Sequence, residues 1–405
     1  MPEAASAAPV RSERLARWLL LALLALSIVQ PWLRKEPFDL EVFRLAGERL
    51  RLGETLYRAS DGAMPFKYSP PVALLFVPLT WVSVRTGYLC WLLLSAAALL
   101  RVLTWSQRAL GGVPDARREV LILLLCTPFV AHLLYLGQCD ALLLFLAVQS
   151  EAVRRRAPVG SGLLLALAAL VKPPFLLFGL LAGARRERRR IVGLVAGLVV
   201  AFSSTVAVLG PARAAAETTA WRALLAETTP GALCGIANQG LAGLVCTYLG
   251  QQPGSWGFPV AAGGVALALA CGVVWVIRRI RRGTPALADG LAVAMTFYGT
   301  AFLSPLGWRT NLLALIPVLA LLLSPVPPPT DRLARIWRGL AVGAMALTGL
   351  FLNYELLGFE RFQRLQGFRM YGLLGLLVAT ATVVVTLRRA QQPQTRMTAG
   401  VAVSA

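Results

Sequence analysis

Long apolar runs, separated by short clusters of arginine, recur along the whole sequence. A run of about 18 to 20 apolar residues is long enough to cross the hydrocarbon core of a bilayer as a helix. The pattern therefore predicts an all-α, polytopic membrane protein. We expect about twelve transmembrane helices, near residues 15–33, 86–106, 119–137, 139–153, 159–172, 174–184, 191–210, 258–277, 286–303, 308–323, 335–353 and 370–387.

The arginine clusters predict the orientation of these helices. Basic residues concentrate in cytoplasmic loops, so each interval between clusters should cross the membrane an even number of times and leave both termini in the cytoplasm. We expect a single membrane domain over residues 1–405, with flexible cytoplasmic tails at 1–14 and 390–405, and an uncleaved first helix because no small-residue cleavage site follows it. The clusters are Arg11 to Arg17, Arg108 to Arg118, Arg154 to Arg156, Arg185 to Arg190, Arg278 to Arg282, Arg332 to Arg338, and Arg388 with Arg389.

The first external loop is expected to carry structure of its own. An amphipathic piece over residues 40–52 is followed by an apolar segment, 70–84, that is too short to count as a crossing. We predict a re-entrant or interfacial segment there, because irregular backbone at membrane depth must be covered by protein or line a cavity. The short runs 159–172 and 174–184 are likewise expected to meet inside the protein, at Lys172 and the two prolines that follow it.

Composition and charge narrow the function. The chain is 57% hydrophobic and 15% charged, below the roughly 25% charged residues of soluble domains. The net charge of +21 fits cytoplasmic arginine clusters better than nucleic-acid binding. No Walker motif or glycine-rich fingerprint is present, and the lone histidine and scattered cysteines have no metal-ligand spacing. We therefore expect no nucleotide cofactor, no metal and no nucleic-acid partner.

Two of the six cysteines, Cys234 and Cys246, share one predicted external loop. An oxidising compartment would permit a disulfide between them. Isolated cysteines in membrane proteins also serve as small apolar residues, and we favour that alternative for this pair.

Asp39, just beyond the first apolar run, is the strongest candidate for a catalytic group. Partial burial would raise the pKa of its carboxylate and make it a better general base. Asp39 also suits the N-cap position of the predicted helix 40–52. The two roles are compatible, because a cap fixes the position of the carboxylate.

Lys172 and Arg309 are candidates for binding a phosphate group. A lysine in the middle of an apolar run costs roughly 2.5–3.5 kcal/mol on insertion scales and usually marks a functional site, although snorkelling to the interface is the alternative. Arg309 begins a predicted helix, and a guanidinium can bind phosphate through two hydrogen bonds.

The remaining candidates are polar and aromatic residues of the predicted external loops. Their side chains suit sugar hydroxyls and sugar rings, but solvated turns, helix caps and interfacial aromatic residues would use the same residue types. As sugar- or acceptor-binding candidates we select Gln138, Asp140, Asn238, Gln239, Tyr57, Tyr68 and Trp308.

The order of these motifs resembles glycosyltransferase family 87. The resemblance spans nearly the whole chain and rests on Asp39, Gly53, Tyr57, Tyr68-x-Pro70-Pro71, Gly137-Gln138-x-Asp140, Lys172-Pro173, Asn238-Gln239 and Ser304-Pro305-x-x-Trp308. Family members often have asparagine where this chain has Asp140. They often have histidines after the Ser-Pro-x-x-Trp motif, where this chain has Arg309, Thr310 and Asn311.

The resemblance implies a GT-C-like fold and a catalytic acid in the first external loop, a position that falls on Asp39. It implies an enzyme of the bacterial plasma membrane that moves a hexose, mannose in typical members, from a polyprenyl-phosphate donor to a lipid or cell-envelope glycan. It further implies metal-independent transfer on the external face with inversion, from a β-linked donor to an α-linked product.

Two other functions are compatible with parts of the pattern. A transporter or flippase for a lipid-linked substrate also uses broken helices and intramembrane charges, but the two halves of the chain show no convincing repeat. A non-catalytic scaffold of the cell envelope would need no convergence of polar residues at one depth.

Overall fold

The computed structural model describes residues 11–33, 38–58, 61, 64–112, 115–324 and 331–392. Every regular element in these ranges is a helix. In chain order they are α1 (Arg11–Leu33), α2 (Phe38–Leu52), α3 (Pro70–Phe76), η2 (Val77–Trp81), α4 (Val84–Ala109), α5 (Ala116–Leu136), α6 (Asp140–Val153), α7 (Pro158–Val171), η3 (Pro173–Leu176), α8 (Leu177–Ala184), α9 (Arg188–Leu209), α10 (Pro211–Leu233), α11 (Leu241–Tyr248), α12 (Gly257–Arg281), α13 (Pro285–Phe302), η4 (Arg309–Ala314), α14 (Leu315–Leu322), α15 (Arg332–Phe351), α16 (Tyr354–Leu357), α17 (Phe359–Gly367) and α18 (Met370–Gln391).

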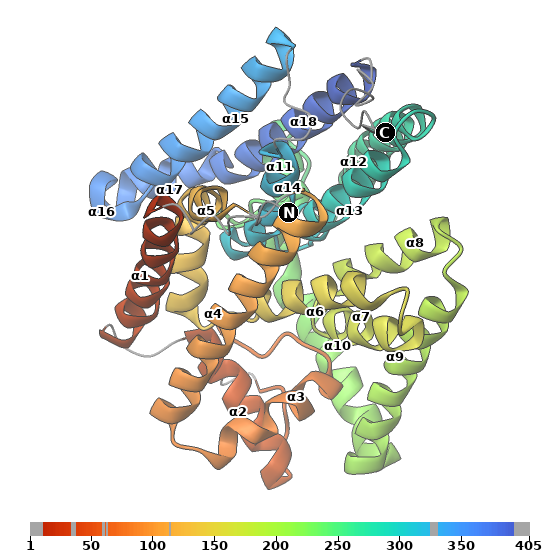
Figure 1. The fold of residues 1–405 in the computed structure, drawn as a ribbon. Coiled ribbons are helices and arrows are strands. Elements are labelled where there is room, and N and C mark those ends of the chain that lie inside the picture. The colour runs from red at the N-terminus through yellow and green to blue at the C-terminus, as the bar shows by residue number, and fades with distance from the viewer. Residues whose placement is uncertain are drawn as a thin grey trace, which may run out of the picture.

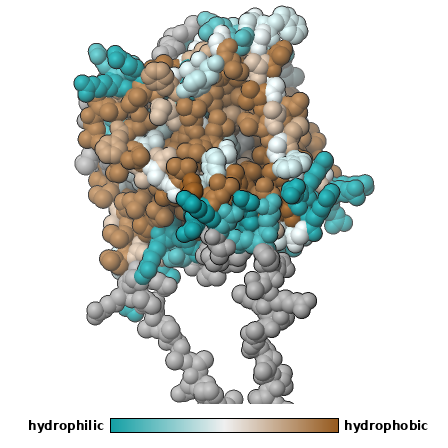
Figure 2. Space-filling model, turned by 90° about the horizontal axis from the view of Figure 1, so that it is seen from above, coloured by the Kyte–Doolittle hydropathy of each residue, from teal (hydrophilic) through white to brown (hydrophobic). Residues whose placement is uncertain are grey.

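Five of the described helices are long and apolar enough to cross a membrane: α4, α5, α9, α12 and α18. Four shorter apolar stretches lie at Pro70–Trp81, Pro158–Val171, Pro173–Ala184 and Arg309–Leu322. Figure 2 shows the corresponding surface, a broad band of hydrophobic side chains between more polar edges. An apolar belt of this kind is the surface that a protein exposes to lipid.

The core forms around the short helix α14, which lies near the centre of Figure 1. Every residue from Leu315 to Leu322 is buried, and α14 packs against α4, α5, α13 and α18. A helix that is apolar on all sides requires neighbours on all sides. This requirement explains why so short an apolar segment is stable at the middle of the molecule.

Helices α7 and α9 approach each other closely at two glycines. A Cβ atom added to Gly162 would clash with the backbone of Arg190 and Leu194, and one added to Gly193 would clash with the backbone of Val159. Small residues let two membrane helices approach this closely. The pairing fixes α7, whose C-terminal end carries Lys172.

The twelve segments predicted as transmembrane helices lie largely on described helices. Five described helices are long and apolar enough to cross a membrane, so the count of twelve crossings stays a prediction. The segment 70–84 contains α3 and η2. Residues 211–257, between two predicted membrane helices and expected from the sequence to form a long external loop, contain the helices α10 and α11. Helix α10 is rich in alanine, which favours a helix, but it has no apolar run to reveal it. The predicted tail 1–14 is also helical from Arg11, and α18 extends to Gln391; residues 1–10 and 393–405 lie outside the described part of the chain.

Helix α10 fastens the segment between α2 and α3. The buried carboxylate of Glu217 accepts hydrogen bonds from the backbone N–H of Leu56 at 3.1 and 3.3 Å. The indole of Trp221 donates to the carbonyl of Lys67 at 3.0 Å. Figure 1 shows α2, α3 and α10 together at one edge of the molecule.

Candidate active site

The turn between α5 and α6 places two polar residues inside the protein. Gly137 ends α5 with a left-handed φ of 68°, a conformation that glycine adopts without strain. The turn leaves Gln138 only 7% exposed and Asp140, the first residue of α6, only 4% exposed. These side chains are therefore buried, and the solvated-turn alternative is wrong.

Gln138 joins this turn to Asp39. Its amide Nε2 donates to the Oδ2 of Asp39 at 2.8 Å, and its Oε1 accepts the backbone N–H of Cys139 at 3.2 Å. Helix α2 begins at Phe38, so Asp39 lies within its first turn and not at the predicted N-cap position. The carboxylate of Asp39 thus faces α6.

Burial raises the pKa of Asp39 above its ordinary value of 3.8, while the hydrogen bond from Gln138 and the positive charge of Lys172 act in the opposite direction. The negative charge of Asp140 raises it further. A half-buried carboxylate with a raised pKa is the electrostatic environment expected of a general base.

A second buried group contains Lys172. Its Nζ donates to Asp140 Oδ1 at 2.5 Å and to Asn311 Oδ1 at 2.9 Å. The other oxygen of Asp140 accepts the hydroxyl of Thr310 at 2.8 Å. An ammonium has three N–H donors, so two protein partners leave one donor for a ligand.

Pro173 and Pro174 explain why Lys172 is inside the protein. A residue before proline is kept out of the helical region, and Lys172 accordingly has φ −129° and ψ 104° and ends α7. Its side chain is 14% exposed and lines a small pocket together with Phe175, Thr300 and Asn311. The snorkelling alternative is therefore wrong.

Asp39 and Lys172 belong to one site. Gln138, which bonds Asp39, and Asp140, which bonds Lys172, are separated by a single residue. The site is therefore built from four elements that are distant in sequence: α2, the α5–α6 turn, the end of α7 and η4. Among the described residues, no group of three His, Cys, Asp or Glu side chains could hold a metal ion.

Arg309 begins η4, directly before Thr310 and Asn311, and its own contacts are with α17 and α18. Successive residues of a 3₁₀-helix are directed to three different sides. Arg309 packs over the rings of Phe362 and Tyr371, at 5.7 and 5.6 Å from their centroids, and donates to the Tyr371 hydroxyl at 3.3 Å. Its buried Nε has no hydrogen-bond partner among the described residues.

The side-chain amides of Asn238 and Gln239 form hydrogen bonds with backbone groups of other segments. Asn238 donates to the carbonyls of Leu233 and Pro305 and accepts from the N–H groups of Gly240 and Gly307, all at 2.8 to 3.0 Å. Its side chain is 1% exposed. These bonds position the loop that leads into Thr310 and Asn311.

Gln239 forms a similar set of contacts on the side of α18. Its Nε2 donates to the carbonyls of Ile236 and Gln366 at 2.9 and 3.1 Å, and its Oε1 accepts from the N–H of Gly372 at 3.4 Å. The side chain is 2% exposed.

The three aromatic candidates occupy different environments. Tyr57 donates its hydroxyl to the carbonyl of Tyr68 at 2.7 Å. Burial raises the pKa of the Tyr68 phenol, as do Cys139, Asp140 and Asp39 beside it, so Tyr68 adjoins Asp39 and Asp140. Trp308 is 36% exposed.

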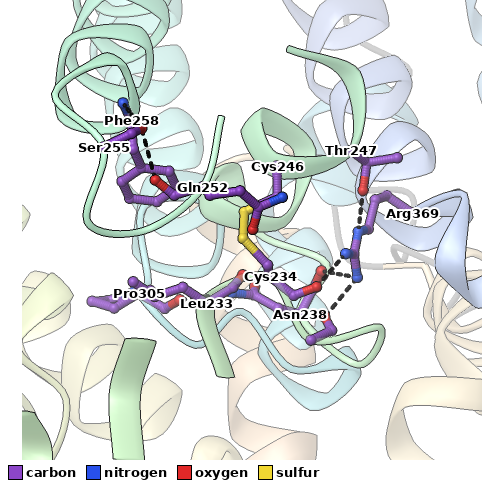
Figure 3. Close-up of a disulfide and its surroundings, with 11 residues drawn as sticks. Leu233, Cys234, Asn238, Cys246, Thr247, Gln252, Ser255, Phe258, Pro305 and Arg369 are labelled. Atoms are coloured by element: carbon purple, nitrogen blue, oxygen red, sulfur yellow. Dashed lines mark hydrogen bonds between the residues drawn. A yellow bond between two sulfur atoms is a disulfide. The ribbon is translucent and has the colours of Figure 1, made fainter. Parts of the chain in front are cut away.

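A disulfide connects Cys234 and Cys246, whose Cα atoms are 5.5 Å apart. The preference for unpaired cysteines is therefore wrong: α11 folds back on the end of α10 and brings the two thiols together. As Figure 3 shows, Arg369 lies against the same loop. Its guanidinium donates to the carbonyls of Cys234 and Gly235 at 2.7 and 2.6 Å and to the hydroxyl of Thr247 at 2.8 Å.

Sequence reasoning gave no role to Thr310, Asn311, Glu217 or Arg369. Thr310 and Asn311 follow Arg309 directly, so their position beside a recognised motif was the available signal. Glu217 and Arg369 are buried, at 4% and 3% exposure. Their partners are mostly backbone groups from distant segments, which no local pattern reveals.

The described residues form a helical protein with an apolar belt, and its polar residues converge on a buried, charged candidate active site. These features define a polytopic membrane protein. Comparison with known proteins gives the family. A family model, described as "Glycosyltransferase family 87", matches residues 66–305, and the chain belongs to this family.

A curated relative from Mycolicibacterium smegmatis (strain ATCC 700084 / mc(2)155) is 28% identical to this chain in an alignment 319 positions long, and the alignment covers 69% of this chain and 68% of the relative. It is named a polyprenol-phosphate-mannose-dependent alpha-(1-2)-phosphatidylinositol mannoside mannosyltransferase. No solved structure matches this chain.

Proposed function

We propose that this glycosyltransferase transfers a hexose, mannose by similarity to its relative, from a polyprenyl phosphate to a lipid or cell-envelope glycan, with Asp39 as the general base. The observation that carries the proposal is the convergence of a half-buried carboxylate and a buried ammonium on one turn. The relative's dependence on polyprenol-phosphate-mannose supports the donor class.

In this reaction Asp39 accepts the proton of the acceptor hydroxyl as that oxygen attacks the anomeric carbon. The bond between the anomeric carbon and the phosphate oxygen breaks, and polyprenyl phosphate leaves with the bonding electron pair. Attack opposite the leaving group inverts the centre, so a β-linked donor gives an α-linked product. Lipid phosphate is already a competent leaving group, so the protein supplies a base and charge stabilisation.

Lys172 binds the leaving phosphate through its remaining N–H donor. Asp140 and Asn311 hold the ammonium in place, and Thr310 orients Asp140. Arg309, with unused donors and two aromatic rings behind its guanidinium, is a second phosphate contact. A fixed cation stabilises the charge that develops on the phosphate without reorganising during the reaction.

Gln138, Asp140, Tyr57 and Tyr68 border the sugar, and the partly exposed ring of Trp308 stacks on the sugar or sets the depth of the lipid. We assign Asn238 and Gln239 a positioning role, because their amides are engaged by the backbone. Both termini and the arginine clusters lie on the cytoplasmic side of the bacterial plasma membrane, and the site faces the external side.

The proposal is tested with purified protein in detergent, a radiolabelled sugar donor and a lipid extract as acceptor. Polyprenyl-phosphate mannose should yield a labelled glycolipid, whereas GDP-mannose should yield none. Transfer from GDP-mannose alone would contradict the lipid donor. Accumulation of intact donor inside proteoliposomes with no covalent product would instead establish a transporter or flippase.

A further inference from the structure

A second charged pocket lies at the opposite end of α6 from the active site. Its volume is about 460 Å³, and it is lined by Arg101, Gln149, Glu151, Ala152, Val153, Arg154, Arg155 and Arg156. The 14 residues of α6 separate it from Asp140 by about 20 Å, given a rise of about 1.5 Å per residue. The pocket is therefore separate from the site of sugar transfer.

Glu151, the acidic residue that lines this pocket, is already paired with arginines from outside it. Glu151 accepts from Arg190 at 2.6 Å through one oxygen and from Arg185 at 3.0 Å through the other. Arg154 is paired with Glu187 at 2.6 Å and, more distantly, with Asp289. These contacts form a buried ionic network that accounts for Glu151 and Arg154 and leaves the other arginines of the pocket uncompensated.

The uncompensated charges are Arg101, Arg155 and Arg156. Arg101 donates its Nε to Gln149 Oε1 at 3.1 Å, which orients the guanidinium and leaves its two terminal nitrogens without a partner among the described residues. Arg155 and Arg156 are exposed, and no carboxylate in the described ranges pairs with either of them. Three guanidinium groups therefore border one cavity with unused donors.

The position of Arg101 argues for an anionic ligand. It lies on α4, a helix long and apolar enough to span the membrane, eight residues before the end at Ala109. An arginine at membrane depth requires a counter-charge or polar partners, and Gln149 supplies only one neutral acceptor. A phosphate would supply Arg101 with the counter-charge and the hydrogen-bond acceptors that Gln149 does not provide.

We propose that this pocket binds a phosphate group, presented by an anionic phospholipid or as free phosphate. Basic pockets between membrane helices on the cytoplasmic side are suited to phospholipid headgroups. Ala152 and Val153 in the lining give the pocket an apolar edge, as a headgroup site next to lipid tails requires. The site does not depend on the proposed sugar transfer.

The test is native mass spectrometry of the full-length protein with equimolar dioleoylphosphatidylglycerol and dioleoylphosphatidylcholine. The wild type should retain phosphatidylglycerol preferentially. R155Q/R156Q should bind it at least about tenfold more weakly, because each arginine near the membrane surface contributes about one kcal/mol, and about 1.4 kcal/mol corresponds to tenfold. R101Q, which removes the half-buried guanidinium, should also weaken binding.

R281Q/R282Q is the matched control, since it removes two adjacent exposed arginines at the end of α12. It should bind like the wild type. Displacement of the lipid by millimolar inorganic phosphate would identify free phosphate as the source; retention of the lipid would identify the headgroup. Equal retention of both lipids by the wild type, or equal losses in R155Q/R156Q and R281Q/R282Q, would overturn the proposal.

Discussion

Asp39 is subject to two opposing influences that together set its basicity. Burial raises the pKa of its carboxylate, and the N–H of Gln138 lowers it by stabilising the charged form. A general base must be deprotonated to act, so transfer should decline as the pH falls through the raised pKa of Asp39.

Gln138→Leu should raise the pH at which transfer declines on the acidic side of the pH profile, called the acid limb below. The substitution removes the donor that stabilises the carboxylate, so the pKa of Asp39 rises further. The measurement is the pH dependence of kcat/KM in the wild type and the variant. Gln149→Leu, at the far end of α6, is the control and should leave the limb unchanged; a shift of the Gln138→Leu limb to lower pH would contradict this account.

Lys172→Met should lower both stability and activity. It leaves the buried carboxylate of Asp140 without its cation, and breaking a buried ion pair costs about 3–5 kcal/mol. Unfolding in detergent measures the first effect and labelled-donor transfer the second.

The double variant Lys172→Met/Asp140→Asn separates the two roles of Lys172. Without a buried charge to compensate, it should regain most of the lost stability while transfer stays low. Recovery of transfer together with stability would show that Lys172 only neutralises Asp140 and does not bind the donor phosphate.

At the scale of elements, the contact between α7 and α9 determines where Lys172 lies. Gly193→Ala should destabilise the protein by about 1–3 kcal/mol, the usual cost of overpacking, because the new Cβ meets the backbone of Val159. Gly264→Ala is the matched control on α12, where nothing lies within 4 Å. Thermal unfolding of both variants measures the difference, and equal melting temperatures would contradict the close packing.

The apolar runs predict the membrane helices because crossing a bilayer requires a length and a hydrophobicity that the sequence shows directly. They did not predict α10, which has no apolar run and bonds to Leu56 and Lys67 of the loop between α2 and α3. The order of motifs predicted the regions of Asp39 and Lys172. The role of Thr310 could not be predicted, because its contact with Asp140 joins residues 170 positions apart.

At the scale of the whole molecule, the disulfide and Arg369 join three distant segments beside the candidate active site. Arg369 bonds the carbonyls next to Cys234, and Asn238 bonds the loop that precedes η4. Alkylation of the unfolded, non-reduced protein should modify four thiols, those of Cys90, Cys126, Cys139 and Cys271. After reduction it should modify all six cysteines. Six modifications before reduction would contradict the bridge.

Cys234→Ser/Cys246→Ser should destabilise the protein by about 2–4 kcal/mol, as is typical for the loss of a disulfide. Cys90→Ser/Cys271→Ser, at two exposed free cysteines, is the matched control and should change stability little. Unfolding curves under non-reducing conditions make the comparison. Equal stability of the two double variants would show that the bridge contributes nothing to the fold.

The most direct measurement is single-turnover transfer from labelled polyprenyl-phosphate mannose by the wild type and Asp39→Asn, with donor binding measured in parallel. The amide keeps the size of the carboxylate but cannot accept the acceptor's proton. The rate should fall about 10²- to 10⁴-fold, the usual contribution of a general base, while donor affinity changes little. Full activity in Asp39→Asn would contradict the central claim that this carboxylate, held by Gln138 beside Lys172, is the base that activates the acceptor.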